Sequence, residues 1–566
     1  MKFKTGLLVL GAFIAGVWVL FSIATRAPQG PDHRVFVNGT VITMDDNNPM
    51  AEAVSIRDGV IERVGRSEEI LGITDDSTDV VDLRGRTLLP GFVDAHGHFP
   101  GSGQMVFSAD LQSPPIGDIE TLAGLLERLR EQAARRPEGW ITGFGYDDTL
   151  LAEGRHPTRE DLDRVANDRP VAIAHISGHL AVVNSAGLAA LDIDADTPDP
   201  EGGRIVRDNK GRPSGVLEET AARLAMNAMF DIGLSDLVRM TTTAAQDYLA
   251  VGVTTASAGG MPTSLAQVLG LMSRFNIFPQ RVALFPLFEE VGDALLAGEV
   301  ALEDFNGGRV SVPRVKLIAD GSIQGFTGYL SEPYYTAYRG DADYRGYASI
   351  PREDLFEQVD ALYAQKLRFA IHTNGDASIE DALDAIEAAA AAHDWPDARP
   401  LLIHAQMARE DQIDRMATLG VTPSFFPTHT YYWGDRHADI FLGPERAAVI
   451  SPARWAMERG VRFSAHSDTP VTPIEPMQLL WSQVERKTTT GRVLGPEQRI
   501  DRMAALRAIT LDAAWQVFLD DTVGSIEPGK AADLVVMSGN PLTEPDVRDL
   551  VVERVLLNGA EVYSRY

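Results

Sequence analysis

Cysteine is missing from the 566 residues of this sequence. Its absence excludes disulfide bonds, thiolate metal sites, a cysteine nucleophile and a lipid-modified N-terminal cysteine. Any metal ion must therefore be held by nitrogen and oxygen ligands. Positive charge is also scarce, because 51 lysine and arginine residues stand against 80 aspartate and glutamate residues and leave a net charge of −29. Such a field repels phosphate backbones, so we expect no nucleic acid partner.

Long apolar runs are also rare, and the one that stands out is an uncharged run over residues 6–24. Two lysines precede it, which is the pattern of an export signal and places the body of the protein in the periplasm. The run is long enough to cross a bilayer, which takes roughly 17–25 residues. Residues 22–24 nevertheless resemble a cleavage site. Residues 1–33 are therefore predicted to be either a cleaved signal peptide or an N-terminal membrane anchor.

A folded protein is expected, because 45% hydrophobic and 23% charged residues is ordinary globular usage. The length exceeds that of a single core, so a large domain and a smaller unit are expected. Short alternating strands and turns fill residues 34–88 and 523–566. Each of these segments is too small to enclose a core alone, and together they are predicted to form one composite β-sandwich.

The middle of the chain, residues 89–522, alternates apolar runs with alanine- and leucine-rich helical stretches. This rhythm predicts an α/β fold, either a parallel barrel or a doubly wound sheet. An apolar run in this part, LLPGFVDAHGH, ends in His96 and His98. Two histidines at positions i and i+2 of an extended strand point to the same side and can meet one metal ion. By itself the pair is a weak signal, equally consistent with two surface histidines.

Four later apolar runs each end in a candidate metal ligand, namely Lys316, His372, His404 and Asp468. The spacing between His372 and His404 fits one βα unit of a barrel, and the spacing between His404 and Asp468 fits two. Lys316 fits the same barrel if residues 325–349 form a long active-site loop. With the His-x-His strand as the first, the four residues end strands four, five, six and eight. In a βα barrel those ends open on one face, where catalytic groups collect.

Ordered phrases along the chain resemble the amidohydrolase superfamily, and more narrowly the branch that contains N-substituted formamide deformylase (amidohydrolase family 3). They are WITGFGYDD (140–148), SGHLAVVNSAGL (177–188), VKLIADGSIQG (315–325), IHTNGDA (371–377), LIHAQ (402–406), HSDTPV (466–471) and a C-terminal GSIEPGKAADLVV. The resemblance covers residues 34–566. It implies a (β/α)8 TIM barrel with a β-sandwich domain built from both termini. The barrel would carry an insertion after its first strand, over residues 100–250.

The resemblance also implies two divalent metal ions, usually zinc. The implied ligands are His96, His98, Lys316, His372, His404 and Asp468. The first two histidines with the aspartate would bind the more buried ion, and the other two histidines the more exposed one. Lys316, carbamylated by CO₂, would join the ions, because a carbamate is a two-oxygen anion whereas an amine cannot bridge. The alternative for Lys316 is an ordinary barrel lysine paired with Asp320.

Further histidines lie outside this ligand set. The resemblance indicates that His179 reaches into the substrate pocket and hydrogen-bonds a substrate oxygen, with a packing or turn role as the alternative. His429 precedes the aromatic run TYYWGDRH, and His437 ends it. Both are expected on a solvated rim of loops, with the lining of a pocket as the alternative.

These residues predict a metal-dependent hydrolase that cleaves non-peptide amide C–N bonds of a small molecule. Asp468 would accept the proton of the attacking water and return it to the leaving amine. A lactonase or a deaminase could use the same site, and one ion on His96, His98 and Asp468 is a simpler alternative to two. The alternative outside the enzymes is a membrane-tethered binding protein without catalysis. The presence of all six expected metal ligands argues against it. A homo-oligomer is left open.

Overall fold

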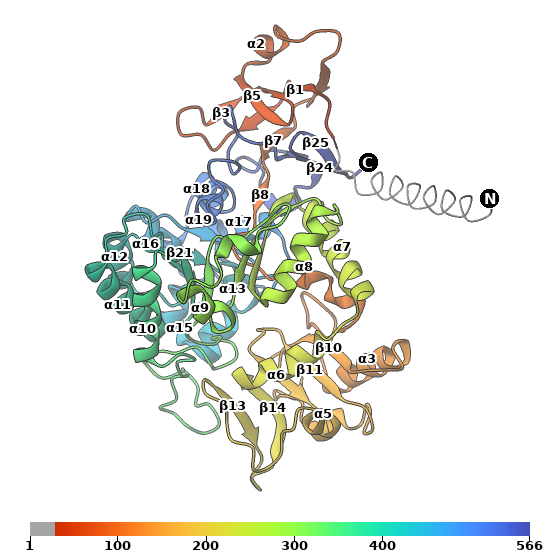
Figure 1. The fold of residues 1–566 in the computed structure, drawn as a ribbon, viewed down its shortest axis with the longest axis vertical. Coiled ribbons are helices and arrows are strands. Elements are labelled where there is room, and N and C mark those ends of the chain that lie inside the picture. The colour runs from red at the N-terminus through yellow and green to blue at the C-terminus, as the bar shows by residue number, and fades with distance from the viewer. Residues whose placement is uncertain (1–28) are drawn as a thin grey trace, which may run out of the picture.

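The computed structural model of the chain describes residues 29–566. The predicted export segment, residues 6–24, lies outside the described residues. Within 29–566, no helix combines the length and the apolar composition needed to cross a membrane. Figure 1 shows three parts along the long axis of the molecule. Strands from both ends of the chain lie at one end, a barrel of strands and helices lies in the middle, and a further mixed unit lies at the other end.

Two sheets built from both ends of the chain form the first part. The four-stranded sheet has the order β5 (Val60–Gly65), β4 (Ala53–Arg57), β1 (His33–Val37) and β6 (Asp79–Asp82). The six-stranded sheet has the order β25 (Ala560–Ser564), β24 (Val552–Leu557), β23 (Leu534–Met537), β7 (Thr87–Pro90), β2 (Thr40–Ile42) and β3 (Met50–Ala51). One buried cluster contains Phe36 and Val54 from the first sheet and Leu88 and Leu534 from the second. The two sheets therefore share a core that neither terminus could form alone.

A ring of parallel strands forms the middle part. In order around the ring they are β8 (Phe92–Val93), β15 (Val253–Met261), β16 (Arg281–Pro286), β18 (Val315–Ile318), β19 (Phe369–Thr373), β20 (Leu401–His404), β21 (Thr422–Phe425) and β22 (Ser464–Ala465). A parallel bridge between Leu287 and Lys316 connects β16 to β18, and the short β17 (Val310–Ser311) also pairs with β16. The backbone N–H of His98 donates to the carbonyl of Thr469 at 2.8 Å, so the segments after β8 and β22 meet and close the ring.

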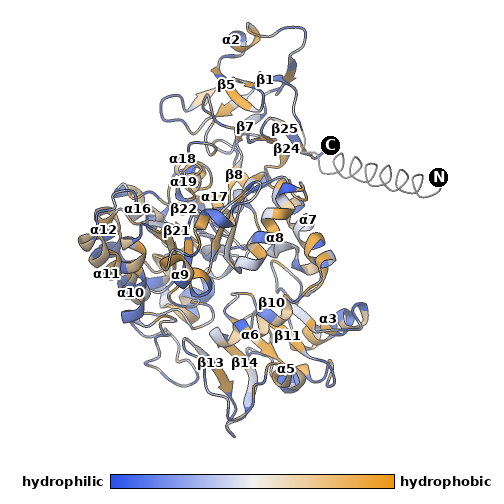
Figure 2. Cartoon of the chain, viewed as in Figure 1, coloured by the Kyte–Doolittle hydropathy of each residue, from blue (hydrophilic) through white to orange (hydrophobic). Residues whose placement is uncertain are grey.

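Helices cover the outside of the ring. They are α8 (Thr263–Arg274), α9 (Phe288–Leu296), α10 (Arg352–Ala364), α11 (Asp376–Ala392), α12 (Glu410–Leu419), α13 (Thr428–Tyr432), α14 (Gly434–Arg436), α15 (Gly443–Ala448), α16 (Ala453–Glu458), α17 (Pro476–Glu485), α18 (Arg502–Ala508) and α19 (Leu511–Gln516). In α11 the buried residues include Ile379, Ala382, Leu383 and Ile386, which lie on one helical face at i, i+3, i+4 and i+7. In Figure 2 hydrophilic residues mark the outward-facing turns of helices such as α12.

The third part is inserted between β8 and β15. Its mixed sheet has the order β13 (Gly203–Arg207), β14 (Pro213–Glu219), β12 (Leu180–Val183), β11 (Val171–His175), β10 (Ile141–Tyr146) and β9 (Ala109–Asp110). Alternate residues of β11 enter two different cores. Val171 and Ile173 lie on the face covered by α3 (Leu122–Arg135). Ala172 and Ala174 lie on the face covered by α6 (Thr220–Met229). This period of two explains why the strand is apolar throughout. The next helix, α7 (Leu234–Ala250), already packs against β15 of the barrel.

The start of the described chain is part of the first core. Strand β1 begins at His33, one residue before the predicted boundary at 34. His33 is buried, and its ring nitrogens lie 3.1 Å from Oγ of Ser55 and 2.9 Å from Oγ1 of Thr78. A chain that starts at residue 34 would lose these contacts.

We expect a protein that starts at Gln29 to fold and bind metal like the full-length chain, because residues 29–566 contain both sheets and the barrel. A protein that starts at Arg34 should be less stable by about 1–3 kcal/mol, since it loses the two hydrogen bonds of the buried His33 ring. Chemical denaturation and metal analysis of the two proteins test this. Aggregation or metal loss in the longer protein would show instead that residues 1–28 contribute to the fold.

Candidate metal centre

The predicted ligands meet at the carboxyl ends of the barrel strands. His96 and His98 follow β8, Lys316 lies within β18, and His372 lies within β19. His404 is the last residue of β20, and Asp468 follows β22 by three residues. All of them are buried except His98, whose side chain is 38% exposed. The centre therefore lies deep in the barrel mouth and opens to solvent on the side of His98, which is the side expected from the sequence to hold the more buried ion.

The shortest contacts of the centre surround His96. Its Nε2 atom lies 3.1 Å from Nζ of Lys316 and 3.3 Å from Oδ1 of Asp468. Nε2 of His98 lies 3.1 Å from the same oxygen. One ligand atom each from His96, His404 and Asp468 lies within 4.8 Å of the others. These spacings bring side chains from distant parts of the chain to one point.

The second pair of histidines lies beside the first. The ring centroids of His372 and His404 are 4.4 Å apart, and those of His96 and His404 are 5.5 Å apart. Nδ1 of His372 lies 3.4 Å from Oδ1 of Asp320. Asp320 therefore faces His372, while the nearest polar contact of Lys316 is His96.

Asp320 also organises the backbone around His372. Its two carboxylate oxygens accept N–H groups of Asn374 and Gly375, each at 2.8 Å, and of Tyr329 at 3.0 Å. The first two residues follow β19, and the third belongs to the loop after β18. The carboxylate thus ties the loop after β18 to the strand end that carries His372.

Outer side chains orient the ligands, as is usual for metal sites. Nδ1 of His98 donates to the carbonyl of Gly259 at 2.8 Å, which leaves Nε2 facing Asp468. Nδ1 of His404 lies 3.0 Å from Nε2 of His466, whose own Nδ1 lies 2.8 Å from Oγ of Ser424. Sequence reasoning missed His466, although it opens the HSDTPV phrase that contains Asp468.

The backbone is strained where it places two of the ligands. His404, Ala405 and Asp468 have φ values of 70°, 42° and 53°, in the left-handed region that side chains other than glycine rarely adopt. Gly259 packs directly on His96, because a Cβ at that position would lie 2.4 Å from the ring. Backbone strain of this kind concentrates at functional sites, where a side chain must be held in one place.

Burial keeps the histidines of the centre in the neutral form. It holds the pKa of His96, His372 and His404 well below the usual value, and neighbouring cationic or imidazole groups add to the effect. Neutral imidazole is the form that binds metal. Burial also lowers the pKa of Lys316 to about 8, so the neutral amine that reacts with CO₂ is accessible near neutral pH. Burial would raise the pKa of Asp468, but His404 and the other imidazoles outweigh it and hold that pKa well below its usual range.

Several atoms in the described part of the centre form no hydrogen bond within the protein, although Oδ1 of Asp468 lies near His96 and His98, and Nδ1 of His372 lies near Asp320. Among the described residues, Nδ1 of His96, Nδ1 of His372 and Oδ1 of Asp468 are buried without a hydrogen bond. Buried polar atoms normally have a partner. Neutral imidazole nitrogens and a carboxylate oxygen are ligands that zinc and similar ions prefer. The residues therefore fit a divalent metal ion.

Comparison with known proteins identifies the family. The model of the amidohydrolase family matches residues 79–563, most of the chain. The chain belongs to the amidohydrolase family. As a member of it, this amidohydrolase is a hydrolase that acts on carbon–nitrogen bonds.

Similar proteins match along nearly their whole length. N-substituted formamide deformylase of Arthrobacter pascens is 30% identical over 94% of this amidohydrolase and 98% of the relative. The putative amidohydrolase YtcJ of Bacillus subtilis is 28% identical over 94% of this chain and 99% of its own. A crystal structure of an uncharacterized metal-dependent hydrolase from Pyrococcus horikoshii covers 91% of this chain and 99% of its own, at 25% identity and a TM-score of 0.71. The neighbours support a (β/α)8 barrel-type fold and, with the cluster of ligand atoms, a divalent metal.

The insertion of this amidohydrolase reaches the metal centre through His179. The ring of His179 lies 4.9 Å from the ring of His372, and its Nδ1 lies 2.8 Å from Oε2 of Glu219. His429 and His437 do not form the solvated rim that the sequence predicts. Both are buried, and Nδ1 of His429 lies 3.0 Å from Nε2 of His437. The aromatic run around them folds inward, since Trp433 is buried in the core of the insertion and stacks on His429 at a centroid distance of 4.5 Å.

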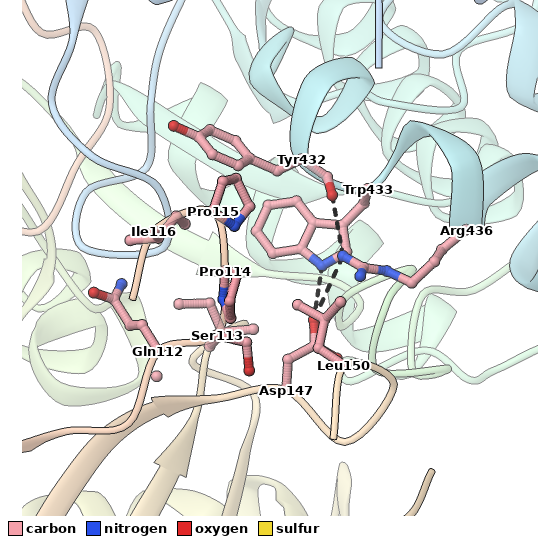
Figure 3. A pocket seen from close by; sticks show the side chains of 12 residues that line it. Gln112, Ser113, Pro114, Pro115, Ile116, Asp147, Leu150, Tyr432, Trp433 and Arg436 are labelled. Atoms are coloured by element: carbon pink, nitrogen blue, oxygen red, sulfur yellow. Dashed lines mark hydrogen bonds and ion pairs between the residues drawn. The ribbon is translucent and has the colours of Figure 1, made fainter. Parts of the chain in front are cut away.

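A second group of aspartates and a histidine lies in the insertion and consists of Asp147, Asp148 and His175. Oδ2 of Asp147 accepts the indole N–H of Trp433 at 2.9 Å and lies 3.8 Å from Nη2 of Arg436. Figure 3 shows these contacts beside a pocket between the insertion and the segment after β21. Because an arginine cation and an indole donor already face this carboxylate, the group serves to join the insertion to the barrel.

We expect His372→Ala and His404→Ala each to lower the metal content by about one equivalent per chain while the fold is retained. Both residues lie at strand ends, where βα barrels place function rather than stability. Metal analysis and thermal melting measure the two effects. His393→Ala is the matched control, because that histidine pairs with Asp360 outside the centre. Unchanged metal content together with unchanged turnover would remove both histidines from the site.

Proposed function

We propose that this amidohydrolase hydrolyses an amide C–N bond of a small non-peptide molecule, with N-formyl and N-acyl amines as the first candidates. The observation that carries the proposal is the group of histidines that surrounds Asp468 at the barrel mouth, in which His96 and His404 are buried. The formamide deformylase named among its relatives supports the same substrate class by analogy.

The centre has ligands enough for two divalent ions, for which zinc is our candidate. One ion would be held by His96, His98 and Asp468, the other by His372 and His404, with carbamylated Lys316 between them. Bound ions would supply Lewis-acid chemistry, by polarising the substrate carbonyl and by lowering the pKa of water towards neutrality. The position of Lys316 supports this arrangement, since its Nζ lies 3.1 Å from a ligand nitrogen in a fully buried setting.

Asp468 is our candidate for proton transfer. Its Oδ1 atom faces both His96 and His98, and its carboxylate has a second oxygen that can take a proton from the attacking water. Burial would raise the pKa of Asp468, but His404 and the other imidazoles outweigh it, so the carboxylate is ionised. It could take a proton from water whose own pKa a bound ion would lower. The same oxygen would then protonate the leaving amine, which completes general base and general acid catalysis by one side chain.

His179 is our candidate for substrate binding. It enters from the insertion, and its ring lies 4.9 Å from that of His372. Burial opposes the protonation of His179, but the carboxylate of Glu219 outweighs it and raises the pKa of the ring. With both ring nitrogens protonated, Nε2–H can donate to the substrate oxygen and help to stabilise the charge that develops there.

A panel of small molecules tests the proposal. Purified protein would be assayed for bound metal and for turnover of formamides, acyl amides, hydantoin-like rings, lactones and aminated heterocycles. We expect metal and amide hydrolysis that is lost on chelation and restored by zinc. Turnover of lactones or deamination alone would assign the site to one of those reactions instead. Metal without turnover of any compound would favour the binding protein.

Export through residues 6–24 is a separate proposal, supported by the lysines and the apolar run in the sequence. Fusion of residues 1–33 to a reporter that is active only outside the cytoplasm would test it. A reporter that stays inactive would place the enzyme in the cytoplasm.

A further inference from the structure

We propose that Glu219 is a positioning residue that fixes the orientation of His179 at the metal centre. The inference rests on the proposed function, because it assigns a role at the same site. His179 precedes β12 and Glu219 ends β14, two paired strands of the insertion. The insertion would thus supply two hydrogen-bonded side chains to a site whose candidate metal ligands all come from the barrel.

The contact between the two side chains is direct. Nδ1 of His179 lies 2.8 Å from Oε2 of Glu219, and the backbone N–H of Glu219 donates to the carbonyl of His179 at the same distance. A carboxylate can only accept, so Nδ1 of His179 carries the hydrogen of this bond. The bond fixes the plane of the imidazole ring and leaves Nε2 for a different partner. Since the ring lies 4.9 Å from that of His372, the partner that suits it is a substrate at the centre.

The backbone of Glu219 is strained. Its φ and ψ values are 54° and −120°, at the start of α6. That conformation is open to glycine and unfavourable for a residue with a Cβ. A glycine at the end of β14 would form the same turn without strain. Backbone strain of this kind concentrates where a side chain serves a function.

The second carboxylate oxygen points to the same conclusion. Oε1 of Glu219 is buried without a hydrogen bond. It packs against Gly321, where an added Cβ would lie 2.1 Å from it. Gly321 follows Asp320, the residue that faces His372. A buried oxygen without a partner lowers stability. The strained backbone and the unpaired oxygen of Glu219 therefore both lower the stability of the fold, at a point next to the metal centre.

A structural role and a positioning role predict different results for Glu219→Gly. If Glu219 mainly holds the strands together, the glycine variant should melt at a lower temperature. If Glu219 positions His179, the variant should melt at the wild-type temperature or above, because strain and an unpaired oxygen are removed, while activity falls. Metal content should stay unchanged in the second case, because no metal ligand is touched.

Glu219→Gln tests the hydrogen bond with little change of shape. We expect kcat/KM on the best amide of the panel to fall about 10²-fold or more, mainly through kcat, since a correctly held imidazole matters most in the transition state. In a His179→Ala background the same substitution should have no further effect, because Glu219 acts through His179. The matched control is Glu218→Gln. Glu218 is equally buried on the same strand and accepts from Tyr338 and Arg339 instead, so this variant should keep most of the wild-type rate.

Several outcomes would overturn the inference. The first is a wild-type rate for Glu219→Gln. The second is an equal fall in kcat/KM when Glu219→Gln is made in the His179→Ala background. The third is a lower melting temperature with loss of metal for Glu219→Gly.

A readout without turnover separates this inference from the proposed function. In protein labelled with ¹⁵N-histidine, the Nδ1–H signal of His179, assigned by its loss in His179→Asn, should be present in the wild type. It should shift or vanish in Glu219→Gln and remain in Glu218→Gln. If no amide is turned over but this pattern is found, the proposed function fails and the positioning role stands. If the wild type lacks the signal, the positioning role fails whatever the activity.

Discussion

Asp468→Asn is expected to lower kcat by about 10²–10⁴-fold while most of the bound metal is retained. Asparagine preserves the shape of the side chain and still offers an oxygen to a cation, but it cannot accept the proton of the attacking water. The expected loss is large because one carboxylate would serve both as base and as acid. Turnover and metal stoichiometry, measured on the same preparation, separate the two properties.

Asp376→Asn provides a control for the loss of a nearby buried carboxylate. Asp376 begins α11 directly after the His372 strand, and its carboxylate accepts from the backbone of Ser331 and from Arg409. This variant should retain its rate within a few-fold, since neither partner is a metal ligand. A variant at 468 that keeps the wild-type rate would exclude Asp468 as the proton-transfer group.

Lys316→Ala should remove at least one metal ion and with it nearly all activity. Lys316 is the candidate for the bridging anion, and without an anion two dications would repel each other strongly, even at an effective dielectric of about 20. Short carboxylic acids such as acetate or propionate should restore part of the metal content and rate, because they can occupy the vacated space as a two-oxygen anion. Metal analysis with and without added acid measures the effect.

Lys316→Met is the matched variant for the rescue. Methionine keeps the apolar stem of the side chain and fills the space, so added carboxylic acids should not restore its metal content. Should Lys316→Ala keep two metals and a near-normal rate, the carbamate bridge would be wrong. A site with one ion on His96, His98 and Asp468 would then be the better description.

The local pattern of the chain was sufficient to predict where the ligands of the centre lie. An apolar run that ends in a polar residue is recognisable without any knowledge of its neighbours. The carboxyl ends of parallel strands in a barrel share one face. His96, His372, His404 and Asp468 could therefore be assigned to one site from their order and spacing, and the family match supports the barrel-type fold that this reasoning assumes.

The surroundings of those ligands could not be predicted in the same way. His466 stands two residues before Asp468, yet its contact with His404 depends on how strands β20 and β22 lie across the barrel. His429 and His437 lie in a segment whose polar residues and glycine indicate an exposed loop, yet it folds into short helices such as α13, and both histidines are buried. Strand β1 includes His33, which pairs with Arg57 and whose ring contacts Ser55 and Thr78, and none of these partners is a neighbour in the sequence.

The sequence by itself determined the class of the protein, through the resemblance of its ordered phrases to a known family. The type of ligand available to a metal followed from composition, and the strand ends that carry the candidate ligands followed from short-range periodicity, which acts within one element of structure. Only the tertiary structure decided that the insertion brings His179 to His372 and that Glu219 holds it there in a strained conformation. The physical reason is that these contacts join residues distant in the sequence, with 40 positions between His179 and Glu219 and a larger separation between His179 and His372, so the folding of the insertion and its packing on the barrel set their distances.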